Sequence, residues 1–128
     1  MQSERTGVHV LVVEDDEFMR AYLRDALVLA GHRVSEARDG DEAIASVTRD
    51  EPALVVLDLL MPQRSGLDAL PKLLQLCPRL QVVVVSSLDS QTLISDALAA
   101  GAVDFVTKPF HPTEIAEAVA RALEEVAA

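Results

Sequence analysis

Short apolar runs rich in valine constrain the fold of this chain more than any other feature. Four of them, bounded by turn or charged residues, lie at positions 8–13, 53–57, 81–85 and 103–107. Runs of this length and composition are typical of buried strands. Residues 33–37 are a weaker fifth candidate with Val34 as their only large apolar residue, which predicts an edge strand.

The segments between these runs have the periodicity of amphipathic helices. Apolar residues recur at helical spacing at Met19, Leu23, Ala26, Leu27 and Ala30, at Ile44 and Val47, at Leu70, Leu73 and Leu74, at Leu93, Ile94, Ala97 and Leu98, and at Ile115, Val119, Leu123 and Val126. Strands that alternate with helices and are apolar on both faces favour a parallel sheet covered on two sides. Since crossovers are right-handed, we expect a doubly wound α/β fold.

Four residues mark expected helix ends or breaks. Gly101 suits a left-handed cap of the fourth helix, and His111 followed by Pro112 is typical of the start of the fifth. Pro71 lies about one turn into the third helix, where its missing N–H predicts a late helix start or a kink.

Length and charge limit the class of protein. The 128 residues fit one domain, which we expect at 8–126 behind a leader at 1–7. A net charge of −10 argues against binding to nucleic acid or anionic lipid, and no apolar run is long enough to cross a membrane. With Cys77 as the only cysteine and no signal-peptide pattern, the sequence predicts a cytoplasmic protein without an internal disulfide.

Reactive side chains follow the ends of four predicted strands. The first strand runs into Glu14 and Asp15, the third ends at Asp58, the fourth at Ser86 and the fifth at Lys108. In a doubly wound sheet these ends meet at one edge, where ligands bind. Clustered carboxylates repel one another and need a counter-charge.

These residue types suit phosphoryl transfer to an aspartate. Carboxylate and carbonyl oxygens are ligands that Mg²⁺ accepts, while Lys108 and Ser86 can each hold a phosphoryl oxygen as Asp58 attacks. Alone, each residue has a simpler interpretation: an aspartate after a strand is usually a turn former, and Asp16 and Glu17 suit the start of the first helix. The simpler interpretations do not explain why all these groups fall at the same end of their strands.

Four segments carry a resemblance to a known family. They are VLVVEDD at 10–16, LVVLDLLMPQRSG at 54–66, VVVVSS at 82–87 and AGAVDFVTKPF at 100–110. In this order and spacing the chain resembles the receiver domain of two-component response regulators over 8–126. The resemblance implies the flavodoxin-like fold with strand order 2-1-3-4-5.

The resemblance also implies the site. A histidine kinase or histidine phosphotransfer protein would phosphorylate Asp58. Mg²⁺ would be bound by Asp15, Asp58 and the backbone carbonyl of Leu60, with Glu14 acting mainly through water. Lys108 stands at the family's lysine position, and its bond to Pro109 would be cis.

A conformational switch is implied as well. Ser86 would move toward the phosphoryl group and Phe105 would rotate into the space it leaves, which changes the face made by the fourth helix, fifth strand and fifth helix. Phe105 has no hydroxyl where many relatives carry tyrosine, and a purely core role is an equal alternative. Leu60 and Leu88 beside the acceptor cannot orient a water molecule, so we hypothesise slow self-dephosphorylation.

Phe18 and Tyr22 lie off the main stripe of the first helix, beside the acidic site. By resemblance the kinase or phosphotransfer partner docks there, and exposed aromatic residues make good anchors. Packing of both against the fifth helix is an equal alternative.

Two other functions suit these residues less well. A phosphatase of the haloacid dehalogenase kind needs a second aspartate where this chain has Leu60, and a pseudo-receiver that docks partners without phosphorylation normally lacks acidic or acceptor residues. We expect no enzymatic activity beyond the chain's own phosphorylation and dephosphorylation, and no direct binding of nucleic acid. The pathway, a phosphorylation-dependent dimer, and a stand-alone protein as against a receiver of a longer one stay open.

Overall fold

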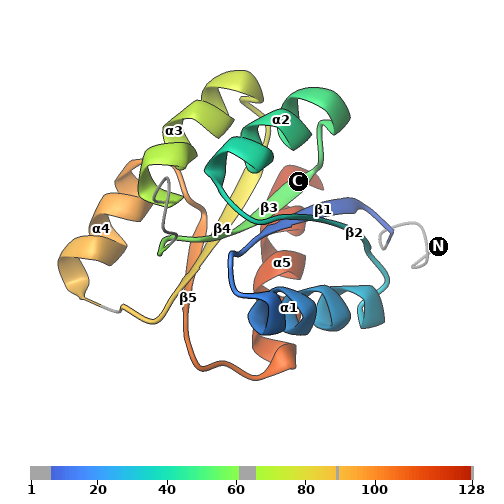
Figure 1. Cartoon of the computed structure of the whole chain (residues 1–128). Coiled ribbons are helices and arrows are strands. Elements are labelled where there is room, and N and C mark those ends of the chain that lie inside the picture. The colour runs from blue at the N-terminus through green and yellow to red at the C-terminus, as the bar shows by residue number, and fades with distance from the viewer. Residues whose placement is uncertain (1–6, 61–65, 89, 128) are drawn as a thin grey trace.

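The computed structural model describes residues 7–60, 66–88 and 90–127, except for the side chains of 125–127. Across these residues five strands alternate with five helices, as predicted (Figure 1). In chain order they are β1 His9–Val13, α1 Glu17–Leu29, β2 Arg33–Ala37, α2 Gly40–Asp50, β3 Leu54–Asp58, α3 Gly66–Leu76, β4 Gln81–Ser86, α4 Gln91–Ala99, β5 Asp104–Thr107 and α5 Pro112–Ala127.

The strands form one parallel sheet in the order β2-β1-β3-β4-β5. This confirms the flavodoxin-like doubly wound fold, with the weak strand β2 at an edge. The register sets Val13 beside Leu57, Asp58 beside Val85 and Ser86 beside Thr107. The carboxyl ends of the strands therefore meet at one edge of the sheet.

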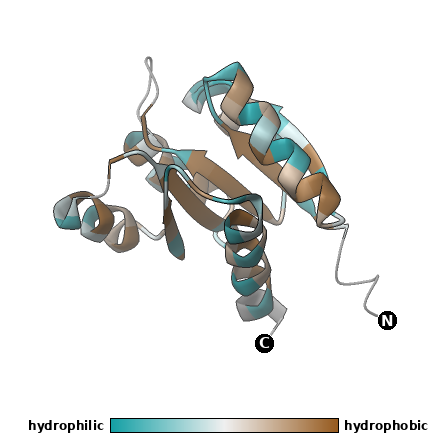
Figure 2. Ribbon diagram, turned by 90° about the horizontal axis from the view of Figure 1, so that it is seen from below, coloured by the Kyte–Doolittle hydropathy of each residue, from teal (hydrophilic) through white to brown (hydrophobic). Residues whose placement is uncertain are grey.

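Alternate residues of the central strands are buried in two separate hydrophobic cores, one on each face of the sheet. Leu11, Val55 and Val84 are fully buried on the face covered by α2, α3 and α4. On the opposite face, which α1 and α5 cover, Val56 and Val83 are fully buried. Figure 2 shows the strands as the hydrophobic centre between helices of mixed hydropathy. A sheet buried on both faces holds its strand ends rigidly, as a site built on them needs.

The predicted helix ends are present. Asp16 caps α1 by accepting a 2.9 Å hydrogen bond from the Met19 amide. Gly101 has a φ of +117°, and the amides of Gly101 and Ala102 close the end of α4 on the carbonyls of Leu98 and Ala97, both at 3.1 Å. α5 begins at Pro112, with the Glu114 carboxylate accepting a 2.7 Å bond from the His111 amide.

Several expected details differ. Three strands begin one residue later than expected, at His9, Leu54 and Asp104, while β3 and β4 run on to include Asp58 and Ser86. The late start expected at Pro71 is wrong: α3 begins at Gly66, since the buried Ala69, Leu70 and Leu73 hold the helix to the sheet despite the missing N–H.

Leu98 is a further correction, because its side chain is 45% exposed rather than part of the buried stripe of α4. It lies about 100° around the helix from Ala97, the buried residue of α4. Residues 1–6 of the expected leader and the side chain of Val126 lie outside the described residues.

Candidate functional site

Glu14 is the most firmly held residue where β1 runs into α1. Its side chain is buried, its amide donates to the Ala37 carbonyl at 3.0 Å, and its Oε2 accepts from the Asp16 amide at 3.1 Å. The next residue, Asp15, is exposed. This loop therefore offers one buried and one accessible carboxylate at the sheet edge.

Asp58 ends β3 beside this loop. The side chain is only 2% exposed, and its Oδ1 accepts a 3.1 Å hydrogen bond from the Leu60 amide. One carboxylate oxygen from each of Glu14, Asp15 and Asp58 lies within 4.8 Å of the others. The strand ends thus bring together three acidic groups that the sequence predicted to meet.

Lys108 is the cation of the site. Its Nζ lies 2.8 Å from Glu14 Oε1 and 3.7 Å from Asp58 Oδ1, and its amide donates to the Ser86 carbonyl at 2.8 Å. The Lys108–Pro109 peptide bond is cis, as expected. A single ammonium faces three carboxyl groups, so the site keeps an excess of negative charge at neutral pH.

Burial and the neighbouring charge perturb the Asp58 carboxyl. Burial, and secondly the neighbouring Glu14, raise the pKa of Asp58 to about 7, although the Leu60 amide and Lys108 oppose the shift. A divalent cation would remove the repulsion by binding the carboxylates. The donor set of carboxylate oxygens at the mouth of a sheet edge fits Mg²⁺.

Ser86 and Phe105 occupy neighbouring strands. The Ser86 side chain is fully buried, and its Oγ accepts a 3.1 Å hydrogen bond from the Leu88 amide. Phe105 pairs with Val84 in the sheet and packs half-buried against the core under α4. Both the switch and the core interpretation of Phe105 fit this position.

The other predicted residues near the site differ in exposure and in their contacts. Leu60 and Leu88 are 45% and 50% exposed, and each lies two residues beyond a site residue, Asp58 and Ser86 respectively. Phe18 is 87% exposed, whereas the Tyr22 hydroxyl donates to the Phe110 carbonyl at 2.9 Å and its ring meets Phe110 edge-on. The two aromatic residues therefore differ: Phe18 is free of the core, whereas Tyr22 packs against Phe110 in the loop before α5.

Two residues that sequence analysis did not single out also shape the site. A Cβ on Gly66 would collide with the Asp58 carbonyl oxygen, so only glycine lets α3 start this close to β3. Arg20 of α1 donates from Nη1 to the Glu14 carbonyl at 2.9 Å. Gly66 is the last residue of the motif at 54–66, so the sequence did contain a signal for it. The contact of Arg20 is to a backbone carbonyl, which no side-chain pattern reveals.

The fold and these strand-end groups define a doubly wound α/β protein with a carboxylate and lysine site at the carboxyl edge of its sheet. Residues 10–120 match the response regulator receiver domain family, and the chain belongs to that family. Receiver domains of this family act with histidine kinases in two-component systems.

Similar proteins include short and long regulators. The chain is 37% identical over 114 residues to the chemotaxis protein CheY of Thermotoga maritima, covering 88% of this chain and 95% of that protein. It is 40% identical over 108 residues to the probable transcriptional regulatory protein TcrX of Mycobacterium tuberculosis, covering 84% of this chain and 46% of that protein.

A solved structure supports the fold. The receiver domain protein (CheY-like) of Methanospirillum hungatei superposes with a TM-score of 0.90 at 24% identity, over 95% of this chain and 98% of that one. Among the described residues, no helix has both the length and the apolar character needed to span a membrane.

Proposed function

We propose that this receiver domain accepts a phosphoryl group on Asp58 from a histidine kinase or histidine phosphotransfer protein, and that its own phosphorylation and dephosphorylation are its only chemistry. The observation that carries the proposal is the buried Asp58 carboxylate, with Lys108 Nζ 3.7 Å away and two further carboxylates beside it. A turn-forming aspartate would have no need of such surroundings.

The residues fit a bound Mg²⁺. Asp15 and Asp58 would ligate it directly together with the backbone carbonyl of Leu60, and Glu14 would act mainly through water. When bound, the cation supplies positive charge for the phosphoryl oxygens and for the carboxylates. The 4.8 Å grouping of the three acidic side chains and their excess negative charge support this ligand set.

The transfer itself uses groups of this chain. An oxygen of ionised Asp58 forms a bond to phosphorus while the bond from phosphorus to the histidine nitrogen breaks, and the imidazole keeps the electron pair. The Lys108 ammonium balances charge on one phosphoryl oxygen, and the Ser86 hydroxyl donates to another. Because the pKa of Asp58 is raised to about 7, positive charge at the site is also needed to keep the nucleophile ionised near neutral pH.

Phosphorylation would then alter the surface made by α4, β5 and α5. The Ser86 hydroxyl, which accepts a 3.1 Å hydrogen bond from the Leu88 amide, would move toward the phosphoryl group and donate its own proton to it. Half-buried Phe105 lies on the adjacent strand and could fill the space that Ser86 leaves. We propose that this coupled movement carries the signal, with packing alone driving Phe105 because it lacks a hydroxyl.

The relatives bear on whether the domain stands alone or is part of a longer protein. The chain spans nearly all of the chemotaxis protein CheY that it matches, but about half of the regulator TcrX. Both a stand-alone regulator and a receiver of a longer protein fit these matches. A cytoplasmic location, where histidine kinases present their phosphohistidine, is part of the same proposal.

Beryllofluoride, which mimics a phosphoryl group on aspartate, tests the site without turnover. We expect ¹⁹F NMR to show bound beryllofluoride only when Mg²⁺ is present, with ¹H–¹⁵N shifts at Ser86 and Phe105. Asp58→Asn removes the anionic oxygen that beryllium binds and should abolish the signal. Absence of binding by the folded wild type would overturn the proposal and favour a pseudo-receiver that docks partners without phosphorylation.

A further inference from the structure

We propose that Arg20, anchored by Glu36, is a positioning residue that fixes the Glu14–Asp15 peptide for Mg²⁺ binding. The inference rests on the proposed function, because it names the residues of α1 and β2 that hold the acidic loop in place. Neither residue belongs to the predicted ligand set.

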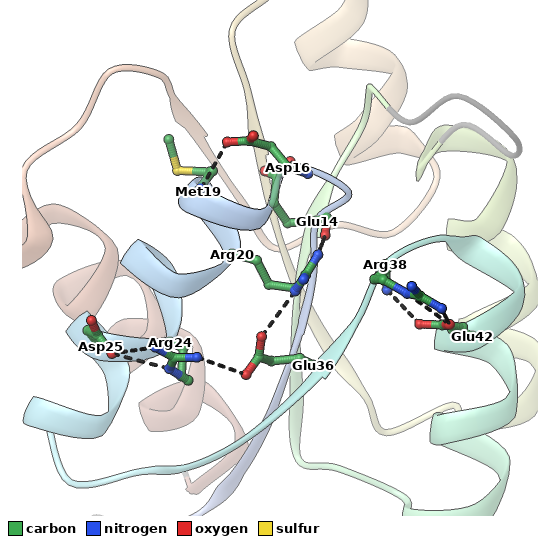
Figure 3. Close-up of polar contacts among 9 residues, drawn as sticks. All are labelled: Glu14, Asp16, Met19, Arg20, Arg24, Asp25, Glu36, Arg38 and Glu42. Carbon is green, nitrogen blue, oxygen red and sulfur yellow. Dashed lines mark hydrogen bonds and ion pairs between the residues drawn. The ribbon is translucent and has the colours of Figure 1, made fainter.

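The guanidinium of Arg20 bonds in two directions. Its Nη1 donates to the Glu14 carbonyl oxygen at 2.9 Å, and its Nε donates to Glu36 Oε1 at 3.0 Å (Figure 3). The Arg20 side chain is only 14% exposed, so water competes weakly for these bonds. The planar guanidinium fork thereby joins the end of β2 to the acidic loop.

Every polar group of Glu14 is engaged by a different part of the fold. The amide donates to Ala37 of β2, Oε1 accepts from Lys108 and Oε2 accepts from the Asp16 amide. The Glu14 carbonyl oxygen accepts a hydrogen bond from Arg20. That carbonyl belongs to the peptide joining Glu14 to Asp15, so its orientation sets the direction in which the Asp15 side chain leaves the loop.

Arg24 provides a natural comparison one turn further along α1. It too reaches Glu36, with Nη1 3.3 Å from Oε2, but its other hydrogen bonds go to Asp25 (Figure 3). Its side chain is 41% exposed. Arg24 thus shares the charge, the helix and the carboxylate partner of Arg20, but its hydrogen bonds go to Glu36 and Asp25 rather than to the acidic loop.

Charge and position predict opposite effects on metal affinity. Removing a nearby positive charge makes an acidic site more negative, so by electrostatics alone the loss of either arginine should tighten Mg²⁺ binding. Loss of a group that orients the ligands should weaken it, typically by 10-fold or more where an outer partner of a metal ligand is removed. The sign of the change therefore separates the two roles.

The experiment is an Mg²⁺ titration of the wild-type chain, Arg20→Met and Arg24→Met, followed by ¹H–¹⁵N NMR. We expect Arg20→Met to weaken binding about 10-fold. Arg24→Met should leave binding unchanged or slightly tighter. Equal or tighter binding by Arg20→Met would overturn the inference.

A metal-free measurement separates this inference from the proposed function. In EDTA, hydrogen exchange of the Asp16 amide, which donates to Glu14 Oε2, should be about 10-fold faster in Arg20→Met than in Arg24→Met. Equal exchange overturns the inference even if Mg²⁺ binds. A wild type that binds no Mg²⁺ contradicts the proposed function, while the exchange rates still decide whether Arg20 holds the loop.

A milder variant covers the case in which Arg20→Met does not fold. Glu36→Gln keeps the shape of the anchor but removes its charge, and Arg20 remains in place. We expect it to speed exchange at Asp16 in EDTA by less than Arg20→Met would; exchange is the deciding quantity here, because the loss of a negative charge weakens Mg²⁺ binding by itself. If exchange at Asp16 matches the wild type, Glu36 is not the anchor and the inference fails.

Discussion

Lys108 Nζ donates a 2.8 Å hydrogen bond to Oε1 of Glu14, a carboxylate 94 residues away in the chain. The bond joins the loop after β5 to the loop after β1, and Glu14 is 1% exposed. The lysine is therefore bound more closely to Glu14 than to Asp58, the proposed phosphoryl acceptor. It neutralises the buried charge of Glu14 and lies 3.7 Å from the Asp58 carboxylate.

The first prediction concerns this pair. Lys108→Met leaves the Glu14 carboxylate buried without its cation, and we expect a loss of about 3 kcal/mol in the free energy of unfolding at pH 8. Glu14→Gln combined with Lys108→Met should recover much of that loss, because the buried Glu14 charge is then removed together with its cation. Urea unfolding of the wild type, Lys108→Met, Glu14→Gln and the double variant in EDTA measures the coupling, and additive losses would show that the two residues do not interact.

The second prediction is a pH dependence of stability due to Asp58. Its pKa in the folded state, about 7, lies above the ordinary value of 3.8, so the folded protein binds the extra proton between these values. The contribution of Asp58 to stability therefore falls as pH rises toward 7 and stays low above it. Asp58→Asn avoids this cost, and its advantage over wild type should grow by roughly 2 kcal/mol from pH 5 to pH 8 in EDTA.

Two controls isolate this effect. Asp16→Asn keeps a helix cap at an exposed position, so its stability should follow the wild-type pH profile. Burial lowers the pKa of His32, which acts in the opposite sense by reducing stability as pH falls, but this contribution cancels because every variant retains His32. Parallel profiles for wild type and Asp58→Asn would show that the Asp58 pKa is not raised.

The third prediction separates Tyr22 from Phe18. Tyr22→Phe removes the hydroxyl that donates to Phe110 but keeps the edge-on ring contact, and should cost about 1 kcal/mol in thermal unfolding. Phe18→Ala should change stability by less than about 0.5 kcal/mol, because the side chain is 87% exposed.

Phe18→Ala should also affect phosphoryl uptake, in a way that depends on the phosphoryl donor. With acetyl phosphate, Phe18→Ala should match wild type, whereas uptake from a phosphorylated histidine phosphotransfer partner should slow. Unchanged uptake from the partner would contradict a docking role for Phe18.

The fourth prediction concerns the lifetime of the phosphoryl group. Exposed Leu60 and Leu88 present no hydrogen-bonding side chain to an attacking water, so we expect the wild-type acyl phosphate to last minutes or longer. Leu60→Asn and Leu88→Asn should each shorten the lifetime several-fold, while Leu76→Asn at the far end of α3 should not. A wild-type lifetime of seconds, followed by mass spectrometry, would contradict the hypothesis.

The sequence predicted the sheet and the meeting of Asp58, Glu14 and Lys108 because both follow from one rule: parallel strands end at a common edge. It did not predict the role of Arg20, whose partner is a backbone carbonyl placed by tertiary structure. Phe18 and Tyr22 are one helical turn apart and look alike in sequence. Only the structure shows that Phe110, from the loop before α5, reaches one of them.

Intact-mass spectrometry after incubation with acetyl phosphate tests the central claim most directly. We predict a gain of one phosphoryl group that requires Mg²⁺, maps to the peptide containing Asp58, and is absent in Asp58→Asn. No gain by the folded wild type, or an equal gain by Asp58→Asn, would contradict the assignment of Asp58 as the phosphoryl acceptor.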